Sequence, residues 1–197
     1  MRLIMLGPPG AGKGTQAALV SAAHGVPAIS TGDIFRANIK NETPLGLQVK
    51  EITSSGGYVP DEITNAIVRD RLTQEDATRG FLLDGYPRTT GQVAALDEML
   101  AGAGHVLDAV VELTVDTDEV VGRLLARAVE QGRADDTEEV IRERMRLYAE
   151  ETAPLAAVYR ERGLLHRVDG MGSVEEVTAR IEQVLGRVRD AAAATDA

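Results

Sequence analysis

The chain has 197 residues and a net charge of −10, with 44% hydrophobic residues, 3% aromatic residues and no cysteine. This length suits one α/β domain whose core is built from Ala, Val, Leu and Ile. The composition excludes disulfides and thiolate metal sites, and without a dense Lys/Arg run we expect no nucleic-acid partner.

Short apolar runs alternate along the chain with segments of helical character. The first run, MRLIML, is too short for a signal peptide or a membrane span, so we expect a cytoplasmic protein without a membrane partner. In chain order, the expected elements are strand 2–6, a helix from Gly12 or Lys13 to His24, strand 27–30, helical pieces near 33–40 and 45–53, a helix from Asp61, strand 80–84, a helix after Thr89, strand 107–114, a helix after Asp116, a long helix from Thr137, strand 164–168 and a helix after Ser173.

Capping residues support several of these helix starts. Asp61 is expected to cap the helix that follows Pro60, and Pro154 is expected to disturb the long helix. The expected capping pairs are Thr89 with Gln92, Asp116 with Glu119 and Ser173 with Glu176. Alternating strands and helices predict an α/β fold with a parallel sheet covered on both faces, and ligands in such folds bind at the carboxyl ends of the strands.

Residues 7–15 read GPPGAGKGT and join the first strand to the first helix. Glycines in such a turn let backbone N–H groups converge on a phosphate, and the helix N-terminus adds partial positive charge. Lys13 supplies a full charge for the terminal phosphates. The strict phosphate-loop motif, G-x-x-x-x-G-K-[ST], requires a hydroxyl where Gly14 stands, and Thr15 comes one residue late. A glycine-rich turn without a ligand is the structural alternative.

The variant G-x-P-G-x-G-K-G-T resembles the nucleoside monophosphate kinase family, and within it the adenylate kinases; the resemblance extends over nearly the whole chain. It implies that the loop binds ATP, with Thr15 near the α- or β-phosphate and Mg²⁺ held largely through water. The ATP-binding residues that it implies are Gly10, Ala11, Gly12, Lys13, Gly14, Thr15, Arg123, Arg127 and Gly172.

Three further motifs, STGDIFR, GGYVPDE and DGYPR, resemble the monophosphate-binding site of the same family. Related pyrimidine monophosphate kinases usually carry a small apolar residue in place of Thr31, which favours AMP over UMP or CMP. Tyr58 stands where Leu is often found in the family, and Tyr86 where Phe is common. The AMP-binding residues that the resemblance implies are Thr31, Arg36, Gly57, Tyr58, Val59, Gly85, Tyr86, Pro87, Arg88, Gln92, Arg133 and Arg144.

The roles of Asp84 and Arg88 can also be argued without the family resemblance. Asp84 ends an apolar strand, where P-loop enzymes place a carboxylate that orients Mg²⁺ and its waters; a turn aspartate is the alternative. Arg88 precedes a capped helix, so its charge opposes the helix dipole, a cost that a bound anion would offset. A solvated surface arginine is the alternative for Arg88.

The stretch after the fourth strand carries more arginines. Arg123 and Arg127 are four residues apart and share one flank of a helix. They resemble the first lid arginines of the family, and Arg133 with Asp135 and Asp136 matches its R-x-D-D motif. The short spacing implies a short lid without zinc. Without the family, each of these arginines reads as a surface residue.

Arg144 lies near the middle of an otherwise mostly apolar stripe of the long helix, whereas Arg142 and Arg146 lie on the opposite side beside acidic residues. A charge inside an inward-facing stripe is costly unless something pairs with it. The partner of Arg144 is either an internal carboxylate, which would be a structural role, or a bound phosphate, which would be a functional role. The family places a phosphate-binding arginine here, which favours the second.

We therefore expect a three-layer P-loop fold with a central five-stranded parallel sheet, a small helical monophosphate-binding lobe and a short lid. The single domain, 1–197, divides into a core of 1–29, 60–126 and 137–197, a lobe at about 30–59 and a lid at about 127–136. The expected catalytic residues are Lys13, Asp84, Arg88, Arg123, Arg133 and Arg144.

The expected reaction is MgATP + AMP ⇌ 2 ADP, carried out by a monomer that needs Mg²⁺ with ATP and holds no zinc. Its partners are ATP, AMP and ADP. A UMP/CMP kinase of the same fold is the alternative. A GTPase would need an N-K-x-D motif, which the chain lacks, and the intact motifs argue against a silent ATP-binding module. A dinucleotide fingerprint fails because Thr15 takes the third glycine position.

Overall fold

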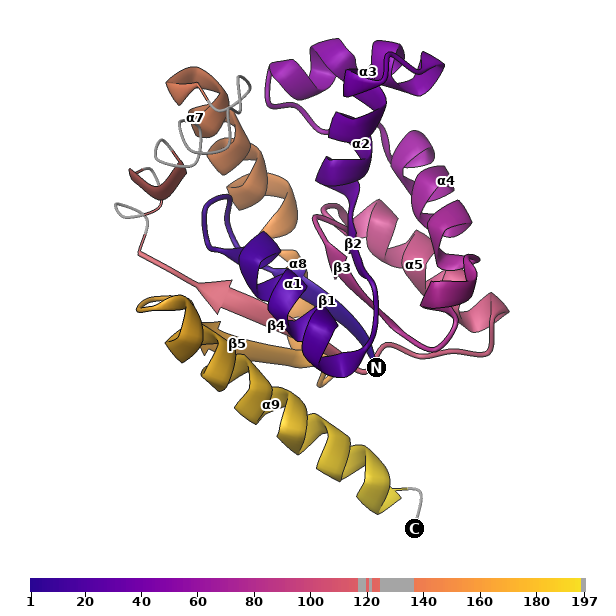
Figure 1. The fold of residues 1–197 in the computed structure, drawn as a ribbon, viewed down its shortest axis with the longest axis vertical. Coiled ribbons are helices and arrows are strands. Elements are labelled where there is room, and N and C mark those ends of the chain that lie inside the picture. The colour runs from indigo at the N-terminus through magenta and orange to yellow at the C-terminus, as the bar shows by residue number, and fades with distance from the viewer. Residues whose placement is uncertain (117–119, 121, 125–136, 196–197) are drawn as a thin grey trace.

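The computed structural model describes residues 1–116, 120, 122–124 and 137–195. Its sheet has five parallel strands in the order β2-β3-β1-β4-β5 (Figure 1). The strands are β1 Arg2–Leu6, β2 Ala28–Ser30, β3 Phe81–Asp84, β4 Ala109–Thr114 and β5 Leu165–Asp169. The expected five-stranded parallel sheet is confirmed, and each strand lies within two residues of its expected bounds.

Helices cover both faces of the sheet (Figure 1). They are α1 Lys13–His24, α2 Thr31–Lys40, α3 Pro44–Ser54, α4 Asp61–Leu72, the 3₁₀ turn η1 Glu75–Ala77, α5 Thr90–Gly102, α7 Glu138–Leu147, the π-helical turn η2 Tyr148–Thr152, α8 Leu155–Glu161 and α9 Val174–Thr195. The helix expected after Asp116 falls mostly outside the described residues, but its Val120 and Leu124 are described and buried.

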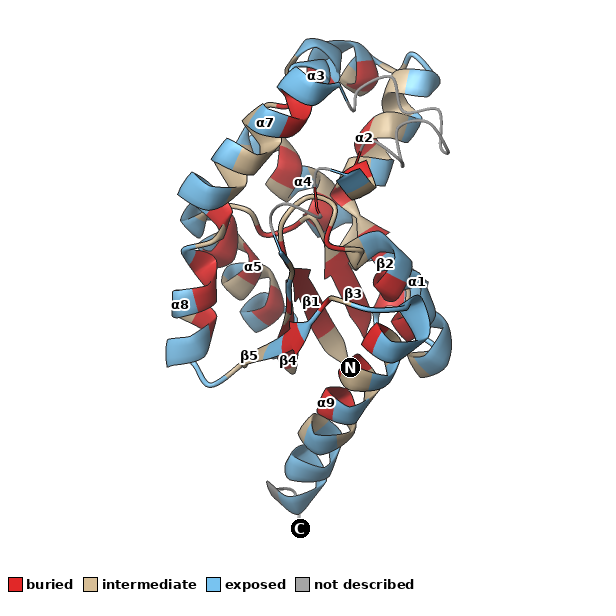
Figure 2. Ribbon diagram, turned by 90° about the vertical axis from the view of Figure 1, so that its left-hand side faces the viewer, coloured by how far each residue is buried: buried red, intermediate tan, exposed pale blue. Residues whose placement is uncertain are grey.

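Successive side chains of a strand point to opposite faces, so the apolar strands feed two cores. Leu3 and Met5 of β1 pack against α1 and α9, whereas Ile4 and Leu6 pack against α4, α5 and α8. In Figure 2 the central strands β1 and β3 are mostly red, hence buried, whereas the edge strand β5 is largely tan and blue, and the outward sides of the helices are pale blue. Strands buried on both faces explain why they read as continuous apolar runs rather than alternating ones.

Helices α2 and α3 lie beyond the sheet, at the same end of the molecule as α7 (Figures 1 and 2). They have a small apolar cluster of their own, in which Phe35, Val49 and Val59 are buried. Thr43 caps α3 by accepting a bond from Gly46 N. Ile63 and Ile67 of α4 also pack against this cluster, so α4 joins the pair of helices to the rest of the fold.

Two of the expected caps are wrong in part. Pro60 is the N-cap of α4, and Asp61 is its first residue, with a carboxylate that accepts bonds from Thr89 Oγ1 and Gln92 Nε2 at 2.7 Å each. Thr89 does cap α5, but Gln92 Oε1 accepts from Arg88 N at 2.7 Å instead of completing the capping box. The side chains of Asp61 and Gln92 therefore bond groups outside their own helix turns rather than the backbone N–H groups that a cap would use.

The long helix is interrupted just before Pro154, as expected. The turn η2 contains a bond from Ala153 N to Tyr148 O, five residues back, at 2.8 Å. Proline cannot donate a backbone hydrogen bond, so a regular helix cannot continue through it. This wider turn directs Tyr148 and Thr152 toward the functional cleft described below.

Tyr159, on α8, offers a test of the core. Its side chain is 1% exposed, and its hydroxyl has no hydrogen-bond partner in the described part of the chain. A buried hydroxyl without a partner costs stability, so Tyr159→Phe should raise the free energy of unfolding by about 1 kcal/mol. Urea unfolding monitored by circular dichroism measures this change, and a clear loss of stability would mean that the hydroxyl has a partner.

Candidate active site

The turn between β1 and α1 forms the first wall of the site. Gly12 is the N-cap of α1 in the left-handed region, with φ 88° and ψ 9°, a conformation that glycine adopts without a steric cost. Lys13 begins the helix, and its Nζ donates to the carbonyl oxygens of Gly7 at 2.7 Å and Pro8 at 2.9 Å. The ammonium therefore lies over the loop, beside the unsatisfied N–H groups of the helix start, where an anion is favoured.

Gly14, the departure from the strict phosphate-loop motif, faces the end of β3. A Cβ built at Gly14 would lie 3.8 Å from Asp84 Oδ2. The Asp84 carboxylate thus lies close to the position where the strict motif would present a hydroxyl. The two elements meet because β1 and β3 are neighbours in the sheet, with Met5 paired to Asp84.

Arg88 follows β3 and is held at several atoms. Its Nε donates to Gly85 O at 2.8 Å, and its backbone N donates to Gln92 Oε1 at 2.7 Å. Burial lowers the pKa of Arg88 below its ordinary value, and the positive charges of Arg144 and Arg36 lower it further. The Asp84 carboxylate acts in the opposite direction, and a half-buried cation with two cationic neighbours still favours a bound anion.

The start of α2 forms the facing wall. Thr31 is 2% exposed, and its hydroxyl donates to Gly85 O at 2.9 Å, the same carbonyl that Arg88 uses. Ser30 caps the helix by accepting from Asp33 N at 3.3 Å. Arg36, one turn further on, pairs with the exposed Asp33. Both walls are therefore tied to the loop that follows β3.

These walls enclose a cleft of about 1140 Å³ at the carboxyl ends of the strands. The expected site residues that line it are Gly10, Gly12, Lys13, Gly14, Thr15, Thr31, Arg36, Gly57, Tyr58, Val59, Asp84, Gly85, Pro87, Arg88, Gln92, Arg123 and Arg144.

Of the expected residues that the structure describes, three do not line the cleft. Ala11 is buried beneath the loop, and Tyr86 is buried in the core, where its hydroxyl donates to Asn65 Oδ1 at 2.7 Å and burial raises its pKa. Gly172 lies in the turn after β5. Arg127 and Arg133 fall outside the described residues.

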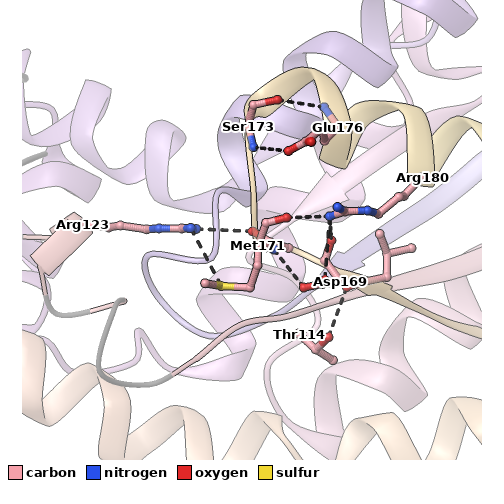
Figure 3. A network of polar contacts seen from close by, with 9 residues as sticks. Thr114, Arg123, Asp169, Met171, Ser173, Glu176 and Arg180 are labelled. Atoms are coloured by element: carbon pink, nitrogen blue, oxygen red, sulfur yellow. Dashed lines mark hydrogen bonds and ion pairs between the residues drawn. The ribbon is translucent and has the colours of Figure 1, made fainter.

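The turn after β5 is fixed by a network of polar contacts (Figure 3). Arg180 Nη1 donates to Asp169 O at 2.9 Å, and Ser173 and Glu176 form the expected capping box of α9. Arg123 reaches this turn through Gly170 O at 3.4 Å. Gly172 has φ 105°, a backbone conformation that residues with a Cβ rarely adopt, so this position favours glycine.

The sequence interpretation missed several cleft residues, among them Lys40, Lys50, Tyr148 and Thr152. The chain has only three lysines, and all three line this cleft. Their scarcity is visible in the sequence and could have marked Lys40 and Lys50 as candidate site residues. No sequence pattern predicts that Tyr148 and Thr152 line the cleft, because the π-helical turn that contains them is a feature of the structure alone.

The charge of the cleft is opposite to that of the protein. Among the described residues, two carboxylates, Asp33 and Asp84, line it against seven cationic side chains, in a chain of net charge −10. The seven are Lys13, Arg36, Lys40, Lys50, Arg88, Arg123 and Arg144. Such a concentration of cations in a concave site attracts polyanionic ligands.

Over the described ranges, no group of three or more His, Asp or Glu side chains is arranged to hold a metal ion. Among the helices of those ranges, none has both the length and the apolar character needed to span a bilayer.

The chain is similar in sequence to known proteins. The sequence model of the family described as adenylate kinase matches residues 5–164. A protein named adenylate kinase from Nocardioides sp. is 62% identical over 94% of this chain and 97% of its own length. Proteins of the same name from Clavibacter michiganensis subsp. michiganensis and Kocuria rhizophila are 60% and 59% identical, over 93% and 94% of this chain and 92% and 99% of their own lengths.

Proposed function

Since the chain belongs to the adenylate kinase family, we infer that it transfers the terminal phosphoryl group reversibly from MgATP to AMP, giving two ADP. The observation that supports this best is the set of seven cationic side chains in one cleft. Two like unit charges about 5 Å apart repel by roughly 3 kcal/mol at an effective dielectric of 20, and two nucleotides bring several such pairs. The UMP/CMP kinase alternative is not favoured, because these relatives carry the name adenylate kinase.

One assay tests the reaction. With MgATP as donor and coupled detection of ADP, AMP should be the fastest acceptor among AMP, CMP, UMP and GMP. Turnover of CMP or UMP above that of AMP would overturn the adenylate assignment.

The loop from Gly10 to Thr15 is proposed to hold the ATP phosphates, with the backbone N–H groups at the start of α1 as donors, while the N–H of Ala11 donates to Pro8 O and holds the loop itself. Lys13 would stabilise the charge that develops on the transferring group. Arg123 is proposed to lie along the donor phosphates, with Arg127 beside it, while Gly172 would shape the adjoining turn.

The acceptor side is proposed to lie between α2 and the loop after β3. Arg36 and Arg88 would bind the AMP phosphate, and Thr31 and Gln92 would lie near the base together with the backbone of residues 57–59. Gly85, Tyr86 and Pro87 would shape this wall, Tyr86 from within the core. Arg144, with Arg133, would reach the transferring group.

No general base is needed in this reaction. The phosphate of AMP is already deprotonated near neutral pH, so catalysis consists of positioning and charge stabilisation. The Asp84 carboxylate lies beside Gly14 of the phosphate loop and suits Mg²⁺ that is held mainly by nucleotide phosphates and water. When bound with ATP, Mg²⁺ would neutralise phosphate charge.

We propose further that residues 30–59 act as a mobile monophosphate-binding lobe and about 127–136 as a short lid. The separate apolar cluster of α2 and α3 supports the first of these segments. Closure over the substrates would keep water from the phosphoryl group. We further propose that the protein acts as a monomer in the cytoplasm.

Thr31 is expected to help select adenine. Thr31→Ala removes a hydroxyl near the proposed base site, and Gly85 O keeps its bond from Arg88 Nε, so the loop should retain its shape. The variant should lose about tenfold in kcat/KM for AMP, keep its KM for ATP, and narrow the gap between AMP and CMP. Steady-state kinetics with both acceptors measure this, and equal losses for AMP and ATP would contradict the role.

The purified protein is expected to hold no tightly bound metal without nucleotide. Zinc sites in proteins need several Cys, His or carboxylate ligands, and the chain has no cysteine and three histidines far apart in sequence. Asp84 alone is a weak Mg²⁺ ligand. Elemental analysis measures the content, and stoichiometric zinc would contradict the proposed short lid.

A further inference from the structure

Three segments that are far apart in the sequence meet at Arg88. Arg88 follows β3, Tyr58 lies in the turn between α3 and α4, and Thr152 is the last residue of the π-helical turn η2. All three residues line the cleft, and Thr152 is 6% exposed. Their contacts therefore join the proposed monophosphate lobe to two parts of the core.

The direction of the hydrogen bonds follows from their partners. Thr152 Oγ1 lies 2.9 Å from Arg88 O, and since a carbonyl oxygen can only accept, the single hydroxyl proton of Thr152 is donated there. Tyr58 Oη lies 2.9 Å from the same Thr152 oxygen. With the threonine proton already used, Tyr58 must be the donor. The bonds thus run from Tyr58 through Thr152 to Arg88.

The ring of Tyr58 makes a second contact with the same arginine. Arg88 Cζ lies 4.9 Å from the ring centroid, a distance at which a guanidinium is attracted by the aromatic face. The backbone N and Nε of Arg88 bond Gln92 and Gly85. Within the described part of the chain, its terminal Nη1 and Nη2 make no hydrogen bond, so they are the two nitrogens left for a ligand.

We propose that Tyr58 and Thr152 are positioning residues that hold Arg88 ready for the acceptor phosphate, an inference that rests on the proposed function. A long arginine side chain loses rotamer entropy when it binds an anion. Holding the backbone and the face of the guanidinium beforehand reduces that loss and so raises affinity for the phosphate. An aliphatic side chain at position 58 could supply neither the hydrogen bond nor the aromatic face.

The test compares AMP with adenosine, which lacks the phosphate, by isothermal titration calorimetry. Tyr58→Phe keeps the ring and removes the first hydrogen bond, and Thr152→Val removes both bonds in a side chain of similar shape. Each should raise the Kd for AMP by about 3- to 10-fold, the scale of one or two hydrogen bonds, and leave the Kd for adenosine unchanged. The KM for ATP should also stay unchanged.

Two further variants separate positioning from general damage. Thr152→Ser keeps the hydroxyl and should bind AMP within about 2-fold of wild type, because both hydrogen bonds can form. The double variant of Tyr58→Phe and Thr152→Val should lose little more than Thr152→Val alone, because both substitutions break one chain of bonds. Tyr159→Phe, the same chemical change in the core, is the control and should leave both affinities unchanged.

The outcomes distinguish this inference from the proposed function. A wild type that phosphorylates AMP, with a Tyr58→Phe variant that binds AMP equally well, would overturn the positioning role alone. Equal losses for AMP and adenosine would place Tyr58 on the base instead and also overturn it, as would fully additive losses in the double variant. A wild type that binds AMP no better than adenosine would overturn both proposals.

Discussion

Lys13→Met is expected to lower kcat/KM by about 10²- to 10³-fold, the scale of losing one preorganised charge-stabilising donor. Lys13 begins α1 on the phosphate loop, and its ammonium already lies over Gly7 O and Pro8 O in the cleft. Methionine has a similar length and no charge. The substitution therefore removes the proposed electrostatic contribution while the packing around the loop changes little.

The fold should survive this change. The lysine side chain lies at the mouth of the cleft, so methionine there creates no cavity in either core. Arg142→Met is the control, because Arg142 does not line the described cleft and pairs with Glu138 on the solvent face; it should stay within a few-fold of wild type. Kinetics and a circular-dichroism melt measure both variants. A large drop in the melting temperature of Lys13→Met would make Lys13 structural instead.

Arg144→Ala is expected to reduce kcat by about 10²-fold or more, whereas Arg142→Ala should remain within a few-fold of wild type. Both arginines are on α7. Arg144 lines the cleft, as Arg88 does, and its charge lowers the pKa of Arg88. Arg142 is exposed and pairs with Glu138 at 2.6 Å, an ion pair on the solvent face of the kind that contributes little.

The melting temperature of Arg144→Ala distinguishes a phosphate-binding role for Arg144 from a structural role in an internal ion pair. If it serves phosphate, Arg144→Ala should melt near the wild-type temperature, because repulsion from Arg88 is relieved as the side chain is lost. If it serves an internal carboxylate, the variant should be strongly destabilised, since a partner would be left without its charge. Comparable activity of the Arg144 and Arg142 variants would refute the catalytic role.

Much of the fold is local in origin and could be predicted from the sequence. Apolar runs long enough for a buried strand gave all five strands, and the alternation of helices between them gave a parallel sheet. The capping box of Ser173 and Glu176 formed as expected, because both residues belong to one helix turn and need no other element. The solvent-facing side of α7 was also predictable, since helical geometry alone separates Arg142 from Arg144.

The candidate site was predictable in its motifs but only partly in its contacts. The glycine loop and the arginine after β3 carry their chemistry in short segments, and each lies at the end of a strand. Gln92 and Asp61 were expected to serve their own helices, yet they bond each other across 31 positions at 2.7 Å. A polar side chain bonds the nearest suitable partner, and packing brought a partner from another helix within reach.

The sequence by itself therefore determined the strands, the phosphate loop and the family, because each is written in consecutive or regularly spaced residues. Only the tertiary structure decided that three scattered lysines line one cleft and that Tyr58, Thr152 and Arg88 form one chain of contacts. Tyr58 and Thr152 are 94 residues apart in the chain. No local pattern encodes such a pair, since it arises when the turn before α4 and the π-helical turn pack against the same loop.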